Sequence, residues 1–273
     1  MQLSQIQLLK RTLSTYAPPV FRLVRESRML MHQHKNQRIQ NDLLPWKTFF
    51  IQEFGLTVQD GPFSGLSLEE TDPKDAYLPL LIGCYEAETH PFIEAALARG
   101  PSVIIDVGCD IGYIAVGLAR RAPQSAVIAF DINPEARIKC KQLAQRNGVS
   151  GRLSVQGNCT PELLQSVCGE HPLVFSDCEG CELELLDPVA VPALIGADII
   201  VELHDFLRID VDITPTIVKR FSETHDISTT GIQRRSVDSF PSVASLPERM
   251  RDAAMHEDRV PYQQWAFLKS RAR

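Results

Sequence analysis

Three side chains that can carry protons follow two apolar runs of this 273-residue chain. Asp177 comes directly after the run 173–176, Glu202 closes the run 199–202, and His204 lies two residues further on. Because residues two apart in a strand point the same way, Glu202 and His204 should face one side of a sheet. A histidine in such a place can act as a general base. We predict that His204 is a base oriented by Glu202, with Asp177 as the alternative base.

Two other uses of these side chains stay open. Asp177, Glu202 and His204 could bind a metal ion together with Asp205, since carboxylates and imidazoles are common ligands. His204 could also be an ordinary surface or helix-capping residue. From the sequence we assign no metal ligand, and we keep Asp177, Glu202 and His204 as catalytic candidates.

A turn with two glycines follows the earlier apolar run 103–107, and residues 107–113 read Val-Gly-Cys-Asp-Ile-Gly-Tyr. Gly108 permits a tight turn and close approach of a ligand, and Gly112 permits close packing where a helix starts. The amides of that helix start are free to donate. The pattern is not the G-x-G-x-x-G of dinucleotide enzymes. A plain strand-to-helix turn is the alternative.

A second aspartate, Asp131, closes the next apolar run and lies 25 residues after Asp106. A carboxylate at the end of the second strand can accept hydrogen bonds from both hydroxyls of a ribose. It suits an unphosphorylated ribose, as in NAD or S-adenosylmethionine, and disfavours a 2′-phosphate. Asp131 could also cap the helix that opens at Pro134. The two roles are compatible.

Cys178 and Cys181 form a C-x-x-C pair beside Asp177. A zinc half-site would need a second pair at a useful spacing, and the sequence has none. A thioredoxin-type pair would follow a different strand of the pattern. We therefore place little weight on metal or redox chemistry at these cysteines.

These residues depend on a framework of alternating strands and helices. The helices are expected over 85–99, 111–121, from Pro134, 161–167, 181–186 and 214–221. The strands are expected over 103–107, 126–130, 153–156, 173–176, 199–202, 227–229 and 264–268. Such alternation predicts a parallel α/β sheet. Ligands bind such sheets at the carboxyl ends of the strands, where the candidate residues gather.

Residues 1–75 are expected to form an N-terminal helical extension, and residues 76–273 the ligand-binding domain. Apolar periodicity indicates helices over 3–15 and about 20–40, whereas 45–66 appears irregular or partly helical. Residues 1–40 carry seven basic and one acidic residue, a net charge of +6, and the other 233 carry 21 basic and 33 acidic residues, a net charge of −12. The basic arm should dock on the acidic core or on a second copy of the chain, which would form a homodimer. The alternatives are an arm that binds RNA or an anionic membrane, and a solvated helix face.

Composition excludes several classes of protein. The chain is 44% hydrophobic, which is enough for a sizeable core, and its seven cysteines are too few for a disulfide scaffold. No apolar run approaches the roughly 20 residues of a membrane helix. The start shows no secretory signal, so we expect a cytoplasmic location. The net charge of −6 disfavours bulk nucleic-acid binding.

Four blocks in order resemble class I S-adenosylmethionine-dependent methyltransferases, and more narrowly the FkbM-like family. They are IIDVGCDIGYIAVGLA, AFDINPEA, FSDCEGCELELL and IIVELH. The third is the most specific, because it resembles the family's D-x-E-G-x-E-x-x-x-L block, whereas the first two resemble methyltransferases at large. The resemblance spans roughly residues 80–205.

The resemblance implies a Rossmann-like, mostly parallel sheet of seven strands flanked by helices, with the last strand antiparallel. It also implies S-adenosyl-L-methionine as cofactor, with Asp106 and Gly108 at the methionine portion, Asp131 at the ribose and Asn158 near adenine. Asp177 would lie near the methionine amine and the substrate. The full set of expected cofactor-binding residues is Glu86, Asp106, Gly108, Asp110, Gly112, Asp131, Ile132, Asn158 and Asp177.

Three of these residues depart from the usual family pattern or have an alternative role. Relatives commonly have asparagine in place of Asp110, whose extra carboxylate could meet the cofactor's ammonium group or cap a helix. Many have glutamate in place of Asp131, which preserves the chemistry. Glu86 is expected on a helix that covers the cofactor, where it would touch cofactor or substrate unless it merely lies on a solvated face.

The function this resemblance implies is methyl transfer to a small-molecule acceptor, most simply a hydroxyl of a sugar, lipid-linked sugar or secondary metabolite. The alternatives are an RNA or protein methyltransferase that uses the basic arm, an NAD-linked oxidoreductase, and a non-catalytic binding module with the same fold. Amino-directed base methylases often carry an Asn- or Asp-Pro-Pro-aromatic block where this chain has Asp177-Cys178-Glu179-Gly180. An NAD-linked oxidoreductase is disfavoured because this chain lacks the third glycine of the dinucleotide-binding pattern.

Overall fold

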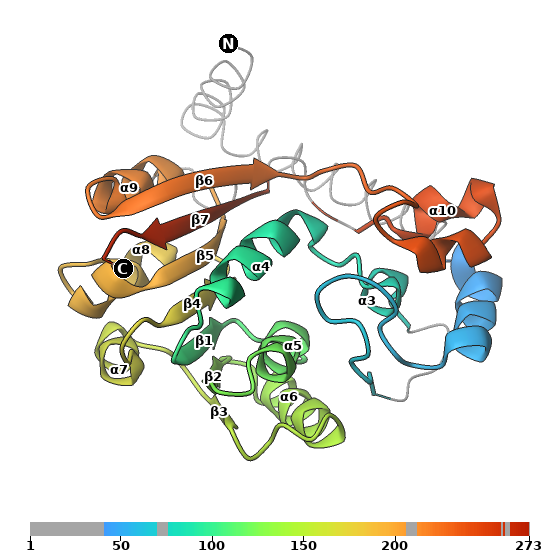
Figure 1. Cartoon of the computed structure of the whole chain (residues 1–273), viewed down its shortest axis with the longest axis horizontal. Coiled ribbons are helices and arrows are strands. Elements are labelled where there is room, and N and C mark those ends of the chain that lie inside the picture. The colour runs from blue at the N-terminus through green and yellow to red at the C-terminus, as the bar shows by residue number, and fades with distance from the viewer. Residues whose placement is uncertain (1–40, 70–75, 206–211, 258, 260–262, 273) are drawn as a thin grey trace, which may run out of the picture.

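The computed structural model describes residues 41–69, 76–205, 212–257, 259 and 263–272. Their centre is one seven-stranded sheet with the strand order β3-β2-β1-β4-β5-β7-β6 (Figure 1). The strands are β1 Val103–Val107, β2 Ala126–Phe130, β3 Leu153–Gln156, β4 Leu173–Ser176, β5 Asp198–Leu203, β6 His225–Gly231 and β7 Gln264–Ser270. The expected fold class, including the antiparallel last strand, is confirmed.

Strand direction brings the functional loops to one edge. Strands β1 to β5 run parallel to one another, and β7 runs antiparallel to both β5 and β6. The chain order reverses beside β1, since β2 lies on one side of it and β4 on the other. A ligand crevice forms at such a reversal, outside the carboxyl ends of the strands.

The two sheet faces are covered by different helices, and β1 shows why. Ile104 belongs to one hydrophobic cluster, whereas Ile105 and Val107 belong to the other, as the two-residue period of a strand requires. The first cluster includes residues of α4 His90–Ala98, α5 Tyr113–Arg121 and α6 Pro134–Arg146. The second includes residues of α7 Pro161–Val167, α8 Glu182–Leu185 and α9 Ile213–Phe221.

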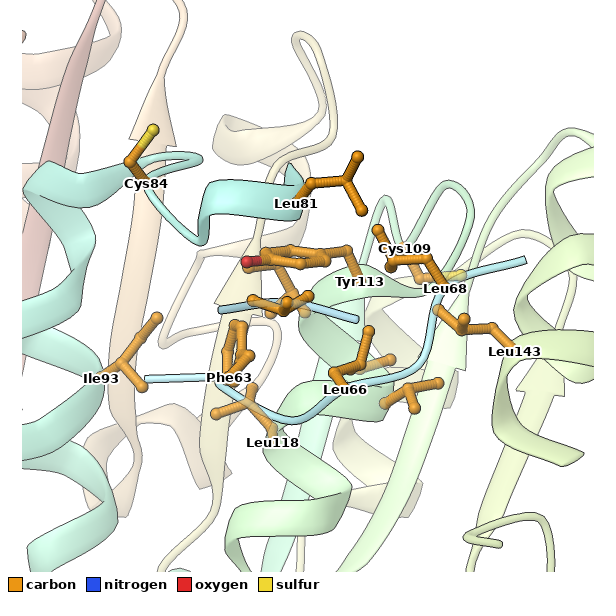
Figure 2. Packing of buried hydrophobic residues seen from close by; sticks show 14 of the residues in the cluster. Phe63, Leu66, Leu68, Leu81, Cys84, Ile93, Cys109, Tyr113, Leu118 and Leu143 are labelled. Atoms are coloured by element: carbon orange, nitrogen blue, oxygen red, sulfur yellow. The ribbon is translucent and has the colours of Figure 1, made fainter. Parts of the chain in front are cut away.

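Residues 41–69 join the first cluster. Residues 41–54 are helical and 55–69 form an irregular segment with one isolated bridge between Thr57 and Ser67. Figure 1 shows the helix over 41–54, in blue, beside α10 Glu248–Ala254, in orange, and both contribute to that cluster. In Figure 2 Phe63 of the irregular segment points at the helix that carries Tyr113 and Leu118. The predicted domain boundary after residue 75 stays a prediction, because 70–75 lie outside the described residues.

Short elements account for most differences from the predicted pattern. The sequence did not indicate α3 Leu78–Ile82, the 3-10 turns η2 Pro192–Gly196 and η3 Pro241–Ser245, or α10. Segments of five to seven residues carry too few apolar repeats for a helical period to stand out. The helix over 41–54 is more regular than the expectation for 45–66.

The single helix expected over 85–99 is wrong. The structure has a 3-10 turn, η1 Ala87–Thr89, followed by α4 from His90. Glu86 has φ 51°, a left-handed backbone conformation that cannot belong to a right-handed helix. Pro91 lies in the first turn of α4, where its missing amide costs nothing but where a helix from upstream could not continue.

The sequence also led to expectations about N-terminal helices and about membrane-spanning segments. The predicted helices over 3–15 and 20–40, and with them the homodimer arm, lie outside the described residues. None of the helices in the described part of the chain combines the length and the apolarity that crossing a bilayer requires.

Candidate functional site

The turn between β1 and α5 packs directly on the end of β4. Gly108 has φ 88°, and a Cβ on it would lie 1.8 Å from the backbone oxygen of Asp177. Gly112 has φ 91°, and a Cβ there would lie 2.7 Å from Sγ of Cys140 in α6. Both positions therefore require glycine, which confirms the conformational part of the prediction. The turn brings the backbone at Gly108 to the reversal point of the sheet.

Asp131 joins the loops after β1 and β2. Its Oδ2 accepts a hydrogen bond from the amide of Asp110 at 2.9 Å, and its Oδ1 accepts one from the amide of Asn133 at 2.7 Å. The cap of α6 is Asn133, which accepts from the amide of Glu135 at 2.9 Å. The suggestion that Asp131 caps this helix is therefore wrong, and its carboxylate instead fixes the loop at the sheet edge.

The other residues expected at the cofactor differ in exposure. Asp110 adopts φ 42° in the same loop. Ile132 is 78% exposed, and Asn158 is exposed in the loop after β3. Asp106 is 1% exposed, beneath the turn. These residues surround one edge of the sheet, but Asp106 offers its surface to the protein rather than to solvent.

Burial controls the charge of Asp106. Desolvation raises its pKa to about 7, against the effect of a hydrogen bond from the Ala115 backbone, and nearby Asp131 raises it further. Its Oδ2 is buried without a hydrogen-bond partner within the described part of the chain. A carboxyl group with a pKa near neutrality beneath the turn can respond to a charge bound above it.

The predicted catalytic residues form a compact cluster at the ends of β4 and β5. His204 Nε2 lies 3.4 Å from Asp177 Oδ1 and 3.4 Å from Glu202 Oε2. On its other side, Nδ1 donates a short hydrogen bond to Glu182. The side chains of Glu182, Glu202 and His204 are at most 3% exposed, whereas that of Asp177 is 29% exposed. Asp177 is therefore the member that a ligand can reach.

The charges of the cluster differ from the prediction. Burial alone would lower the pKa of His204, but hydrogen bonds to Glu182 and Glu202 raise it to about 10. A protonated imidazole has no lone pair with which to take a proton, so His204 would have to lose its own proton before it could act as the predicted base. Burial, Glu202 and Glu86 raise the pKa of Asp177, whereas hydrogen bonds from His204 and Asp177 outweigh the burial of Glu202 and lower its pKa.

Asp205 does not join this cluster. Its carboxylate accepts hydrogen bonds from the backbone amide and the hydroxyl of Thr214, the former at 3.0 Å, at the start of α9. A metal site built from all four sequence candidates is thus not what the structure shows. Three of the four converge.

Glu86 lies near the cluster but not on a covering helix. It is 2% exposed and pairs with Arg259 at 2.7 Å. Burial raises its pKa to about 8 despite the opposing effect of Arg259, and Glu202 adds to the rise. Arg259 also contacts Glu88 and Glu257, at 2.7 and 2.6 Å. Glu86 therefore belongs to a buried ion cluster that ties the segment before α4 to the segment before β7.

Cys178 and Cys181 are joined in a disulfide between Asp177 and Glu182. The other five cysteines, Cys84, Cys109, Cys140, Cys159 and Cys168, are free. The sequence argument, which expected a cytoplasmic location and gave little weight to redox chemistry at these cysteines, did not anticipate this bond. It closes the loop that carries Asp177 into the helix that carries Glu182.

Sequence reasoning missed two residues beside the site. Glu182 is part of the block that carries the family resemblance, but its role depends on a histidine 22 positions away in another strand. Arg259 lies in a polar segment without any recognisable pattern. Only the packing of segments distant in sequence identifies these two residues.

Comparison with known proteins finds local similarity. No family model matches the chain. It is 32% identical over 94 residues to the release factor glutamine methyltransferase of Cereibacter sphaeroides, covering 33% of this chain and 34% of that protein. It is 34% identical over 104 residues to the ribosomal protein L11 methyltransferase of Pelotomaculum thermopropionicum, covering 38% and 32%. The chain thus spans about a third of the length of these curated relatives.

Two solved structures are also similar. Cofactor-bound Rv0187 from MTB shares 18% identity at a TM-score of 0.46, covering 69% of this chain and 81% of that one. The O-methyltransferase TomG from Streptomyces achromogenes, in complex with SAM, shares 17% identity at a TM-score of 0.41, covering 83% and 89%.

Proposed function

We propose that this protein is an S-adenosylmethionine-dependent methyltransferase that transfers a methyl group to a hydroxyl of a small molecule. The observation that carries the proposal is the adjacency of two features at one sheet edge. The first feature is the turn at Gly108 together with Asp131, and the second is the buried cluster around His204. The two meet where Gly108 packs on Asp177. The methyltransferase names of the curated relatives support the reaction class.

The residues present fit the cofactor. Each oxygen of Asp131 accepts one amide hydrogen bond, and an ionised carboxylate has about four acceptor sites, so both ribose hydroxyls can still be bound. Asp131 is half-buried, and its neighbour Ile132 is exposed and offers apolar surface to adenine. Asn158 lies in the next loop and would bind the edge of the base. Asp177 would receive the amino group of the methionine portion.

When bound, the cofactor supplies a methyl group on a positively charged sulfur. In the proposed transfer the carbon–sulfur bond breaks as the carbon–oxygen bond forms, and the acceptor hydroxyl loses a proton. Asp177 is the reachable member of the cluster, and its raised pKa makes its ionised form a stronger base than an ordinary aspartate. We assign the proton to Asp177. His204 holds Asp177 and Glu202 in place through its positive charge.

The first experiment is calorimetric titration of the full chain with S-adenosylmethionine and, separately, with NAD. We expect micromolar binding of S-adenosylmethionine and none of NAD. Asp131→Ala should lose binding by at least about tenfold, because the two ribose hydrogen bonds to a charged group contribute roughly 1.5–3 kcal/mol each. Asp252→Ala, an exposed carboxylate on α10, is the matched control. A folded wild-type protein that binds no S-adenosylmethionine would refute the proposal.

The acceptor is tested with a panel of methyl acceptors. Wild-type protein is incubated with labelled cofactor and with polyhydroxylated small molecules, glutamine-containing peptides and RNA. We expect label on the hydroxyl compounds, with Asp177→Asn reducing turnover even at saturating cofactor, because the variant removes both the base and the partner of the cofactor's amino group. Label on the peptides alone would replace the small-molecule acceptor with a protein, as in the names of the curated relatives.

A further inference from the structure

Three potential metal ligands converge at the ends of β4 and β5. Asp177, Glu202 and His204 each offer one ligand atom, and these three atoms lie within 4.8 Å of one another. The two strands pair directly in the sheet, with Ser176 opposite Val201, so the backbone holds the three residues at this spacing. The convergence is a property of the sheet and not of mobile surface side chains.

The spacing matches the coordination shell of a small ion. Both carboxylate oxygens lie 3.4 Å from His204 Nε2. Ligand atoms about 2.1 Å from an ion and separated by the tetrahedral angle are roughly 3.4 Å apart. Asp177 Oδ1 makes no hydrogen bond within the described residues, so its contact with Nε2 is a close approach and not a hydrogen bond.

The far side of the imidazole has the partner that metal-bound histidines use. Nδ1 donates to Glu182, which is fully buried and also accepts from the Gly180 amide at 3.2 Å. A ligating histidine almost always donates its second N–H to a carboxylate, a carbonyl or water, which fixes the ring and points the other nitrogen at the ion. Here that other nitrogen, Nε2, points at Asp177 and Glu202.

Unsatisfied oxygens at the cluster give independent support. Glu202 is 3% exposed, and its Oε1 has no hydrogen-bond partner in the described part of the chain. Glu182 Oε2 is in the same condition. Buried carboxylates normally are paired or coordinate a metal, because an uncompensated buried charge is expensive. Asp177, at 29% exposure, leaves one side of the cluster open to a further ligand.

We propose that Asp177, Glu202 and His204 bind one divalent transition-metal ion, which replaces the proton on His204 Nε2, with Glu182 orienting His204 from behind. One imidazole with two carboxylates suits Mn²⁺ or Zn²⁺ better than Mg²⁺, which prefers oxygen ligands alone. The open side at Asp177 would receive the acceptor hydroxyl, and a bound cation there lowers the pKa of that hydroxyl. The binding site stands on its own geometry, whereas this use of it rests on the proposed methyl transfer.

The test is titration of metal-free full-length protein with Mn²⁺, followed by electron paramagnetic resonance and calorimetry. We expect one ion per chain at micromolar affinity and at least tenfold weaker binding of Mg²⁺. Glu202→Gln and His204→Ala should weaken Mn²⁺ binding by at least about 100-fold, and Glu182→Gln by about 10–100-fold. Glu94→Gln, an exposed carboxylate paired with Arg121, is the matched control and should change nothing.

A spectroscopic measurement on the wild-type protein removes the dependence on folded variants. Electron spin echo envelope modulation of bound Mn²⁺ should show one coordinated imidazole nitrogen. Absence of Mn²⁺ and Zn²⁺ binding, bound Mn²⁺ without the nitrogen signal, or unchanged affinity in a folded Glu202→Gln variant would each overturn the site.

Parallel titration with S-adenosylmethionine separates this inference from the proposed function. Cofactor binding without metal binding would overturn the metal site and leave the methyltransferase proposal. Metal binding without cofactor binding would overturn the methyltransferase proposal and leave the metal site.

Discussion

Glu182 shows how one residue can set the state of a site without facing its open side. Its carboxylate is buried, accepts from Gly180 in its own loop, and holds Nδ1 of His204 in the neighbouring strand. The sequence could indicate Asp177, Glu202 and His204, because each lies at or just beyond the carboxyl end of a strand, where ligands bind. It could not indicate the partner of His204, because that contact exists only after β4 and β5 pair.

Replacing Glu182 by glutamine should change the titration of His204. The variant keeps the shape but removes the charge that helps raise the pKa of His204 to about 10, so in metal-free protein we expect that pKa to fall by about 1–2 units. Nuclear magnetic resonance of the ring nitrogens against pH measures it. Glu184→Gln, exposed on the same helix, should leave it unchanged. An unaltered His204 titration in Glu182→Gln would contradict the assignment.

Gly108 allows a second prediction at the same scale. Alanine there would combine a left-handed backbone with a Cβ placed 1.8 Å from a backbone oxygen that cannot move without shifting β4. We expect Gly108→Ala to lower the free energy of unfolding by about 2–4 kcal/mol, measured with urea. Gly157→Ala has no atom within 4 Å of its new Cβ and should change stability by less than about 0.5 kcal/mol. Equal stability of the two variants would show that the turn relaxes freely.

Among the helices and strands, the aromatic ring of Phe63 holds the segment 55–69 against α5. Phe63 packs against Gly117 of α5, where a Cβ would meet the ring at 2.4 Å, and edge-on against Tyr113 with ring centroids 5.3 Å apart. Figure 2 shows Phe63 and Leu66 over the same helix. Glycine in the middle of a helix is explained by this contact and not by any need for a special backbone angle.

A double-mutant cycle tests the contact. Phe63→Ala should cost about 3–5 kcal/mol of unfolding free energy, and Gly117→Ala about 1–3 kcal/mol through steric overlap. In the Phe63→Ala background the sign should reverse. There Gly117→Ala should stabilise by up to about 1 kcal/mol, because alanine favours helix and the obstructing ring is gone. Urea unfolding of the four proteins decides it, and an equal cost of Gly117→Ala in both backgrounds would disprove the packing.

At the scale of the whole molecule, buried ionisable groups link the sheet to the segments around it. Arg235 and Arg259 contact Glu88 and Glu257, and Arg259 also contacts Glu86, so residues far apart in the chain share one buried ion cluster. His90 lies near this cluster. Its Nε2 is 3.1 Å from the backbone oxygen of Tyr85, and its ring centroid is 6.0 Å from that of Phe240. Global stability should therefore depend on pH through these groups.

His90 provides a signed prediction. Burial lowers its pKa from 6.5 to about 4 in the folded protein, so between these values the unfolded chain binds the proton more readily. Its contribution is fully present above about pH 6.5 and is lost as the pH falls through about 4. Between pH 7 and 4, the free energy of unfolding of His90→Gln should therefore fall by roughly 2–3 kcal/mol less than that of the wild type. Urea unfolding at each pH measures the difference. Parallel pH profiles of the two proteins would exclude the role of His90.

The sequence by itself determined the sheet and the place of the site. Strands β1, β2, β4, β5 and β7 are built mainly from buried apolar residues, which makes them visible without tertiary information, whereas β3 and β6 mix apolar and polar residues. The structure extends β5 and β7 by two residues each and β6 by four residues relative to the predicted strands. The expected fold follows because local pattern and strand alternation agree.

The tertiary structure alone decided which side chains meet and which charges they carry. Glu86 lies outside a helix and pairs with Arg259, and the hydrogen bond between His204 and Glu182 raises the pKa of His204. Contacts between segments far apart in sequence leave no periodic trace in either one. Protonation depends on burial and on neighbouring charges, which exist only once the strands have paired and the helices have covered them.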